Sequence, residues 1–112
     1  MAYSGINILL IEPEEKQNKK IVFFLKKLKH YVSAVHSADE ALKKMSRETP
    51  HVIICNKCIS ESNGVETMKN LRLEINKKSV PFIMLFDKYD ENEFIRAVQC
   101  GIDSIIFPFF GQ

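Results

Sequence analysis

The segment INILLIEPEE, residues 6–15, decides the fold that the sequence predicts. Asn7 to Ile11 is almost wholly apolar, which is typical of a strand buried on both faces. Pro13 then stands at the expected first position of a helix, and Glu14 and Glu15 add acids to its first turn. A buried strand that runs directly into a helix is the repeating unit of a parallel α/β sheet. The same unit should therefore recur along the chain.

The unit recurs as far as the C-terminal end of the sequence. Four further apolar runs predict strands, namely Tyr31–Val35, His51–Cys55, Pro81–Phe86 and Ile105–Phe107. Helices between the strands are expected to group Ile21, Phe24, Leu25 and Leu28, then Ala41, Leu42 and Met45, then Val65, Met68, Leu71 and Ile75, then Phe94, Ala97 and Val98. Ser37–Glu40 and Asp90–Glu93 resemble capping boxes, and Gly101 suits a helix end. Right-handed crossovers then favour a doubly wound, three-layer parallel sheet.

Length and composition limit the classes of protein. The 112 residues suit one domain, 1–112, and 46% hydrophobic with 27% charged residues is typical of a globular chain. A net charge of +2 is too small to indicate nucleic acid or an anionic membrane as partner. No apolar run is long enough to span a bilayer, and the start lacks the basic region of a signal peptide. Three cysteines form no disulfide framework, so we expect a cytoplasmic protein.

Five segments, in this order and spacing, resemble the response-regulator receiver family, the CheY-like domains of two-component and phosphorelay signalling. They are INILLIEPEE, HSADEAL, HVIICNKCISESNGVETMKNLR, VPFIMLF and AVQCGIDSIIFPF, and together they cover essentially the whole chain. The resemblance implies a flavodoxin-like, five-stranded parallel sheet in the order 2-1-3-4-5. It also implies a signalling protein partner.

The resemblance implies a set of functional positions from which this sequence departs. The family's acid pair, which binds Mg²⁺, becomes Glu12 and Pro13, and its nucleophilic aspartate becomes Asn56. Phe86 stands at the position of the Thr or Ser, and Phe107 at that of the lysine before Pro108. An amide lacks the nucleophilic oxygen anion of a carboxylate. We therefore expect no aspartyl phosphorylation and no catalytic residue.

Two expectations follow for the altered site. Glu12 and Glu14 are the only metal candidates, and they are too few for Mg²⁺, so we expect no metal and no cofactor. Phe86 and Phe107 end adjacent strands, so their rings could meet and fill the former phosphate pocket, favouring one fixed conformation over a switch. The alternative is that both rings simply pack in the core.

The predicted function is that of an atypical, pseudo-receiver domain that acts by protein interaction or dimerisation rather than as an enzyme. The family's partner surface implies contacts through Phe94, Ile95, Val98, Ile105 and Ile106. The alternative is a phosphate- or metal-responsive receiver with unusual residues. We expect nucleic acid to be contacted only through an attached output domain, if there is one.

The sequence ends soon after Phe107, where the family continues into a last helix. That helix is apparently lacking, so we expect the sheet near the first and fifth strands to be partly bare. Phe109 and Phe110 folding back, a second copy of the chain, or a longer parent protein would each explain the gap.

Other candidate sites have simpler structural explanations. Cys55 and Cys58 have the spacing of a metal or redox pair, which His51 or Cys100 would have to complete, but a cysteine in a buried strand is usually a small hydrophobe. No Ser or Cys is placed to form a triad with a histidine. The six lysines of the first helix could meet nucleic acid or an acidic protein, or could form an ordinary solvated face: Lys16, Lys19, Lys20, Lys26, Lys27 and Lys29.

Overall fold

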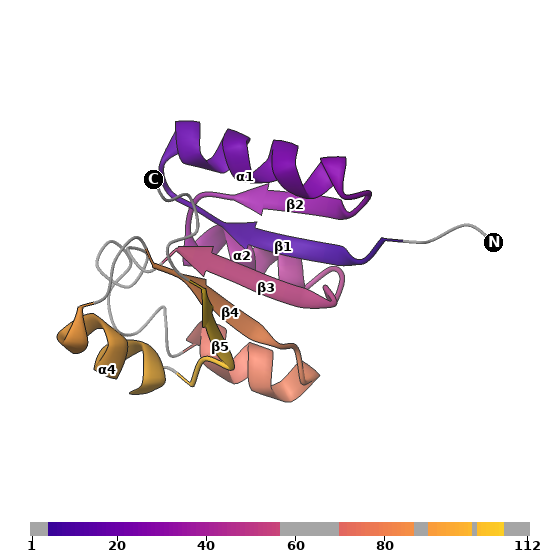
Figure 1. Cartoon of the computed structure of the whole chain (residues 1–112). Helices are drawn as coiled ribbons and strands as arrows, with labels where there is room; N and C mark the ends of the chain where they lie inside the picture. The colour runs from indigo at the N-terminus through magenta and orange to yellow at the C-terminus, as the bar shows by residue number, and fades with distance from the viewer. Residues whose placement is uncertain (1–4, 57–69, 87–89, 100, 107–112) are drawn as a thin grey trace.

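The computed structural model describes residues 5–56, 70–86, 90–99 and 101–106. Its strands are β1 (Asn7–Ile11), β2 (Tyr31–Val35), β3 (Val52–Asn56), β4 (Phe82–Leu85) and β5 (Ser104–Ile106). They form one parallel sheet in the order β2-β1-β3-β4-β5, which confirms the predicted topology (Figure 1). The helices are α1 (Glu15–Lys27), α2 (Ala38–Met45) and α4 (Glu91–Gln99), and residues 70–78 are also helical.

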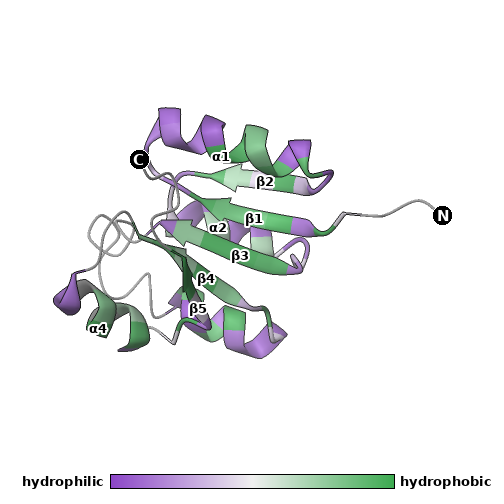
Figure 2. Ribbon diagram, in the orientation of Figure 1, coloured by the Kyte–Doolittle hydropathy of each residue, from purple (hydrophilic) through white to green (hydrophobic). Residues whose placement is uncertain are grey.

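Side chains that alternate along the strands divide the core into two clusters, one on each face of the sheet. Leu9 and Ile11 of β1 pack in the larger cluster, with residues of α2, of the helix over 70–78 and of α4. Ile8 and Leu10 pack in the smaller cluster, with α1. The strands of the middle of the sheet are accordingly hydrophobic along most of their length (Figure 2). The prediction that β1 is buried on both faces is confirmed.

The start of α1 differs from the prediction by two residues. Glu14 is the N-cap, with an extended backbone, and its carboxylate accepts hydrogen bonds from the backbone N–H groups of Gln17 at 2.8 Å and Lys16 at 3.2 Å. Pro13 therefore precedes the cap and is not the first helical residue. A side chain that satisfies free N–H groups sets the helix start more strongly than proline does.

Two predicted helix signals are confirmed. Ser37 caps α2 by accepting a hydrogen bond from the backbone N–H of Glu40 at 3.1 Å. Gly101, just past α4, has a φ of 78°, a left-handed conformation that favours glycine. A Cβ at this position would also meet the guanidinium of Arg72 at 2.6 Å.

The apolar face predicted for α1 is partly wrong. Ile21 and Leu25 are buried as expected, but Phe24 and Leu28 are exposed. The buried residues of α1 are Asn18, Ile21 and Leu25, which form a single narrow stripe. A helix packed on a sheet buries only the side chains that face it, so a wider apolar stripe stays partly exposed.

The expectation of a partly bare sheet is only partly met. On the face covered by α1, Ile8, Leu10 and Ile54 are buried, so the sheet is covered near β1. Ile106 of β5 is exposed. Residues 107–112, on which the predicted lack of a last helix depends, lie outside the described residues, as do Val65 and Met68.

Candidate functional site

The site lies at the carboxyl ends of β1 and β3, where parallel α/β sheets commonly place ligands. Glu12 directly follows β1, and its backbone N–H donates to the carbonyl oxygen of Val35 at 3.0 Å. Asn56 is the last residue of β3. Since Ile11 pairs with Cys55 in the sheet, the next residues on the two strands are neighbours.

Glu12 is a buried carboxylate with hydrogen-bond donors on both oxygens. Only 2% of Glu12 is exposed. Its Oε2 accepts the backbone N–H of Glu14 at 3.0 Å, and its Oε1 accepts Nδ2 of Asn56 at 2.7 Å. A buried carboxylate is stable only when it is paired or hydrogen-bonded, and these donors meet that need. An aspartate at position 56 would instead place a second carboxylate against Glu12.

Glu14, the other predicted metal candidate, serves as a helix cap. The carboxylate of Glu14 caps α1, and Pro13 offers no side-chain oxygen. Among the residues that the structure describes, no group of three or more His, Cys, Asp or Glu is placed to hold a metal ion. The side chains present therefore do not fit the oxygen-rich set that Mg²⁺ requires.

Phe86 occupies the apolar core rather than an open pocket. It is 2% exposed, belongs to the larger core cluster, and its backbone N–H donates to the carbonyl oxygen of Ile106 at 2.9 Å. This position agrees with the simpler core-packing interpretation. Phe107 lies outside the described residues, so the predicted contact between the two rings remains a prediction.

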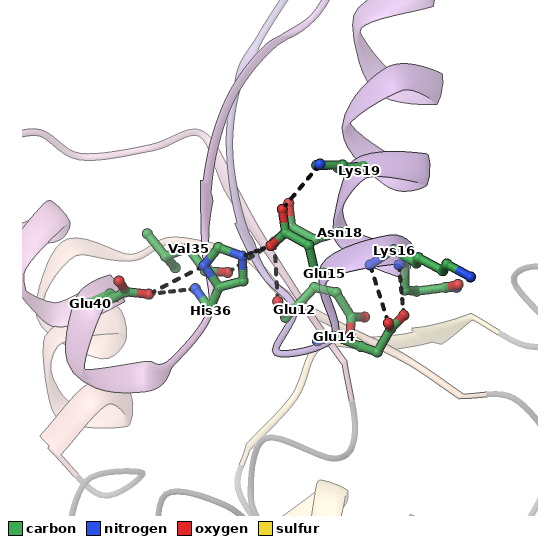
Figure 3. Close-up of polar contacts among 10 residues, drawn as sticks. Glu12, Glu14, Glu15, Lys16, Asn18, Lys19, Val35, His36 and Glu40 are labelled. Carbon is green, nitrogen blue, oxygen red and sulfur yellow. Dashed lines mark hydrogen bonds and ion pairs between the residues drawn. The ribbon is translucent and has the colours of Figure 1, made fainter.

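Asn18 is a residue of the site that the sequence interpretation missed. It is 5% exposed, and its Nδ2 donates to the carbonyl oxygens of Glu12 at 3.1 Å and Val35 at 3.3 Å. Figure 3 shows this side chain of α1 beside the ends of both strands. Asn18 therefore holds together α1, β1 and β2 directly beneath Glu12. The sequence signal that could have identified Asn18 was its position three residues before Ile21, on the buried stripe of α1.

A second missed cluster joins α1 to α2 through His36. The ring Nε2 of His36 lies 2.8 Å from Oε1 of Glu15, and its backbone N–H donates to Glu40 at 2.6 Å (Figure 3). The hydrogen bond with His36, helped by nearby Lys19, holds the pKa of Glu15 below its usual range. The side chains of Glu15, His36 and Glu40 are exposed, so the cluster is a surface link between the helices.

The remaining histidines and Cys55 make contacts that stabilise the fold and do not belong to a candidate site. Nδ1 of His30 accepts the backbone N–H of Ile6 at 3.2 Å, and Nδ1 of His51 accepts that of Asn7 at 2.8 Å. Cys55 is buried in β3, and its thiol donates to the carbonyl oxygen of Asn56 at 3.3 Å, in agreement with the structural interpretation. Cys58 and Cys100 lie outside the described residues.

The predicted interaction surface is largely exposed. Phe94, Ile95 and Val98 of α4 are exposed, as is Ile106 of β5, whereas Ala97 turns toward the core. The prediction that Ile105 belongs to this surface is corrected, because its side chain is half-buried and packs against the larger core cluster. In a strand, neighbouring residues point to opposite faces, so Ile105 and Ile106 cannot share one surface.

Comparison with known families agrees with this geometry. Residues 8–110 match the family described as "Response regulator receiver domain". The chain belongs to the response regulator receiver family. This receiver domain is 22% identical over 99 residues to the phosphate regulon transcriptional regulatory protein PhoB of Escherichia coli, with 88% of the chain and 43% of that protein covered. It thus spans less than half the length of that relative.

Solved receiver structures share the fold of this receiver domain. The receiver domain of the sensor histidine kinase PA1611 of Pseudomonas aeruginosa, with a magnesium ion coordinated in its active-site cleft, has a TM-score of 0.80 at 21% identity, covering 96% of this chain and 88% of that one. The receiver domain of Ssk1 from Saccharomyces cerevisiae, in complex with the histidine phosphotransfer protein Ypd1, has a TM-score of 0.77 at 18% identity, covering 96% and 82%. At this identity the likeness shows the fold.

Proposed function

We propose that this receiver domain of two-component signalling does not accept a phosphoryl group and acts by binding another protein. The observation that supports the proposal is the 2.7 Å hydrogen bond from Nδ2 of Asn56 to Oε1 of Glu12. It joins the position of the family's nucleophilic aspartate to the retained acid. A neutral amide that donates a hydrogen bond to this acid offers no anionic nucleophile to a phosphodonor. The proposal assigns the domain no enzymatic activity.

The same contact argues that the site does not take up Mg²⁺. Magnesium binds several oxygen ligands in octahedral geometry. Asn56 directs an N–H donor, not an oxygen ligand, at Oε1 of Glu12, and Glu14 would have to leave the helix cap to add a second carboxylate. Since Pro13 adds no ligand, we infer that the domain works without a metal or another cofactor.

The proposed partner is another signalling protein or a second copy of the chain. The exposed apolar side chains of α4 form the surface that we propose for this contact: Phe94, Ile95 and Val98. Ile106 is exposed too, but it points to the opposite face of the sheet, because its partner Leu85 belongs to the cluster packed against α1. The described residues contain no helix able to cross a membrane. Because the three cysteines of the sequence make no disulfide framework, we propose a reducing compartment such as the cytoplasm.

The test is an amide-shift titration of the ¹⁵N-labelled whole chain with Mg²⁺ and then with beryllofluoride, a mimic of the acyl phosphate. We expect no saturable shift at Glu12, Asn56 or Phe86. Incubation with acetyl phosphate should leave the intact mass unchanged. The PA1611 receiver domain, which coordinates magnesium, is the positive control.

The second candidate function is a metal- or phosphate-responsive receiver that uses unusual residues. The buried carboxylate of Glu12 favours it, because one metal ligand of the family is retained. Saturable shifts at Glu12 and Asn56 that are followed by shifts along α4 would establish this second function and overturn the proposal.

A further inference from the structure

The positive charge of the chain is concentrated around α1. Residues 16–38 contain six lysines and no Asp or Glu. The whole chain has 16 basic and 14 acidic residues, so the remainder has ten basic and fourteen acidic residues, a net charge of −4. A domain that is nearly neutral overall thus carries a locally basic helix.

An exposed aromatic ring lies in the middle of this basic surface. Phe23 is 68% exposed, the highest value among the exposed large hydrophobic side chains of the described residues. Residues three and four apart are neighbours on a helix surface, and at these spacings Phe23 has four exposed lysines. They are Lys19, Lys20, Lys26 and Lys27. Nζ of Lys27 lies 5.7 Å from the centre of the Phe23 ring, a cation–π distance.

Packing within the chain does not require a phenylalanine at this position. The stripe of α1 that faces the sheet is Asn18, Ile21 and Leu25. Phe23 lies two residues from Ile21 and from Leu25, which places it on the opposite side of the helix. Figure 2 shows α1 hydrophilic at both ends with a hydrophobic stretch between them, which in the sequence is residues 21–25.

We propose that the surface formed by Phe23, Lys19, Lys20, Lys26 and Lys27 docks a protein partner with an acidic rim around a small apolar pocket. An aromatic anchor inside a charged rim is the usual anatomy of a specific protein interface. The lysines would steer an acidic partner to the surface, and the ring would fix its position. The proposal deepens the proposed binding function by adding a surface on α1 to the one on α4.

Two other occupants fit the surface less well. A helix that lies in a membrane buries a broad, continuous apolar face, whereas the apolar residues of α1 are divided, with Ile21 and Leu25 already packed against the sheet. Nucleic acid usually requires a strongly basic domain, whereas this chain has a net charge of +2. The Phe23 ring, bordered by four lysines, suits a small apolar pocket on an acidic protein.

The probe for the test is a labelled helical peptide with a row of leucines bordered by glutamates, titrated into the whole chain at low and high salt. We expect saturable binding with amide shifts confined to residues 15–29. Binding should weaken with salt because exposed charges are screened. The same peptide with glutamines for glutamates, or with alanines for leucines, should bind poorly.

Variants of the chain identify the surface that the peptide uses. Phe23→Ala should weaken binding of the glutamate peptide about tenfold or more, as expected for an aromatic anchor. Lys26→Gln with Lys27→Gln should weaken it several-fold and reduce its salt dependence. Leu73→Ala removes another exposed apolar side chain, outside both proposed surfaces, and should leave binding unchanged. All variants change exposed side chains, so their melting temperatures should match the wild type.

Several results would overturn the proposal. The proposal is wrong if the peptide shows no saturable binding, or if Phe23→Ala leaves that binding intact. The chain could also bind vesicles containing phosphatidylserine, or a single-stranded oligonucleotide, more tightly than the peptide. If Phe23→Ala abolished that binding, a membrane or nucleic acid would replace the acidic protein as the occupant. Sedimentation that depends on concentration and on Phe23 would instead identify a second copy as the occupant. The magnesium titration tests a different part of the domain, so the two proposals can fail separately.

Discussion

At the scale of single residues, the site is defined by a change from a negative group to a hydrogen-bond donor. Nδ2 of Asn56 donates to the buried carboxylate of Glu12, so the pair is stable without a cation. An acid at position 56 would need a metal or a proton to relieve its repulsion with Glu12. In the proposed function, Asn56 therefore supplies no nucleophile and leaves Glu12 satisfied without a metal.

Replacing Asn56 by Asp should destabilise the domain in a pH-dependent way. Two carboxylates at this distance share a proton, so the pKa of the pair is raised in the folded state, which then holds more protons than the unfolded chain. Stability should therefore fall as the pH rises, by about 1–3 kcal/mol near neutral pH relative to the wild type. Urea unfolding of Asn56→Asp at several pH values measures this loss.

Asn56→Ser is the matched control, because it shortens the donor without adding a charge. Its stability relative to the wild type should depend much less on pH. If Asn56→Asp were as stable as the wild type across the whole pH range, the 2.7 Å contact with Glu12 would not describe the site.

At the scale of elements, one side chain of α1 ties the helix to two strands. Nδ2 of Asn18 donates to the carbonyl oxygen of Glu12, which directly follows β1, and to that of Val35, which is the last residue of β2. A buried carbonyl without a donor costs free energy, so Asn18 fixes the turn from which Glu12 projects. His36 adds a surface link between α1 and α2 through Glu15 and Glu40.

Asn18→Ala should lower the free energy of unfolding by about 1–3 kcal/mol, because the carbonyl oxygens of Glu12 and Val35 lose the Asn18 donor, although that of Val35 keeps the backbone N–H of Glu12. Urea unfolding measures the change, and the dependence on urea concentration should stay the same. Gln17→Ala, on the same helix turn, is the control and should change stability by no more than about 0.5 kcal/mol. Equal effects of the two substitutions would contradict the role of Asn18.

At the scale of the whole molecule, exposed apolar side chains form a surface on each of two helices of the described residues. One is the surface on α1 around Phe23, and the other is the surface of α4 with Phe94, Ile95 and Val98. Both lie on helices whose buried stripes are narrow. Because neither surface is needed to complete the core, both are available to other molecules.

Val98→Lys should abolish self-association if the α4 surface joins two copies of the chain. Val98 is 53% exposed, and a lysine there would place a charge in an apolar contact, which should weaken the dimer at least about tenfold. Sedimentation over a range of concentrations measures this. Leu73→Lys changes another exposed apolar residue and should behave like the wild type. A wild type that is monomeric throughout would rule out the homodimer.

The sequence by itself determined the order and approximate limits of the strands and the identity of the altered site. Apolar periodicity is local, so the predicted strand limits differ from the structure by no more than one residue at either end, as at β3, which extends to Asn56 because that residue pairs with Leu85. The change from acid to amide at position 56 is likewise legible in the sequence alone, once the position is recognised. Helix caps such as Ser37 depend on neighbours in sequence and were predicted for the same reason.

Only the tertiary structure decided which polar groups meet and which apolar groups stay exposed. The contact between Glu12 and Asn56 spans 44 positions and depends on β1 and β3 being neighbours. The role of Asn18 and the exposure of Phe24 depend on how α1 lies on the sheet, which sets the width of its buried stripe. Residue type and spacing define a helix and its apolar side, but the surface that covers it decides how much of that side is buried.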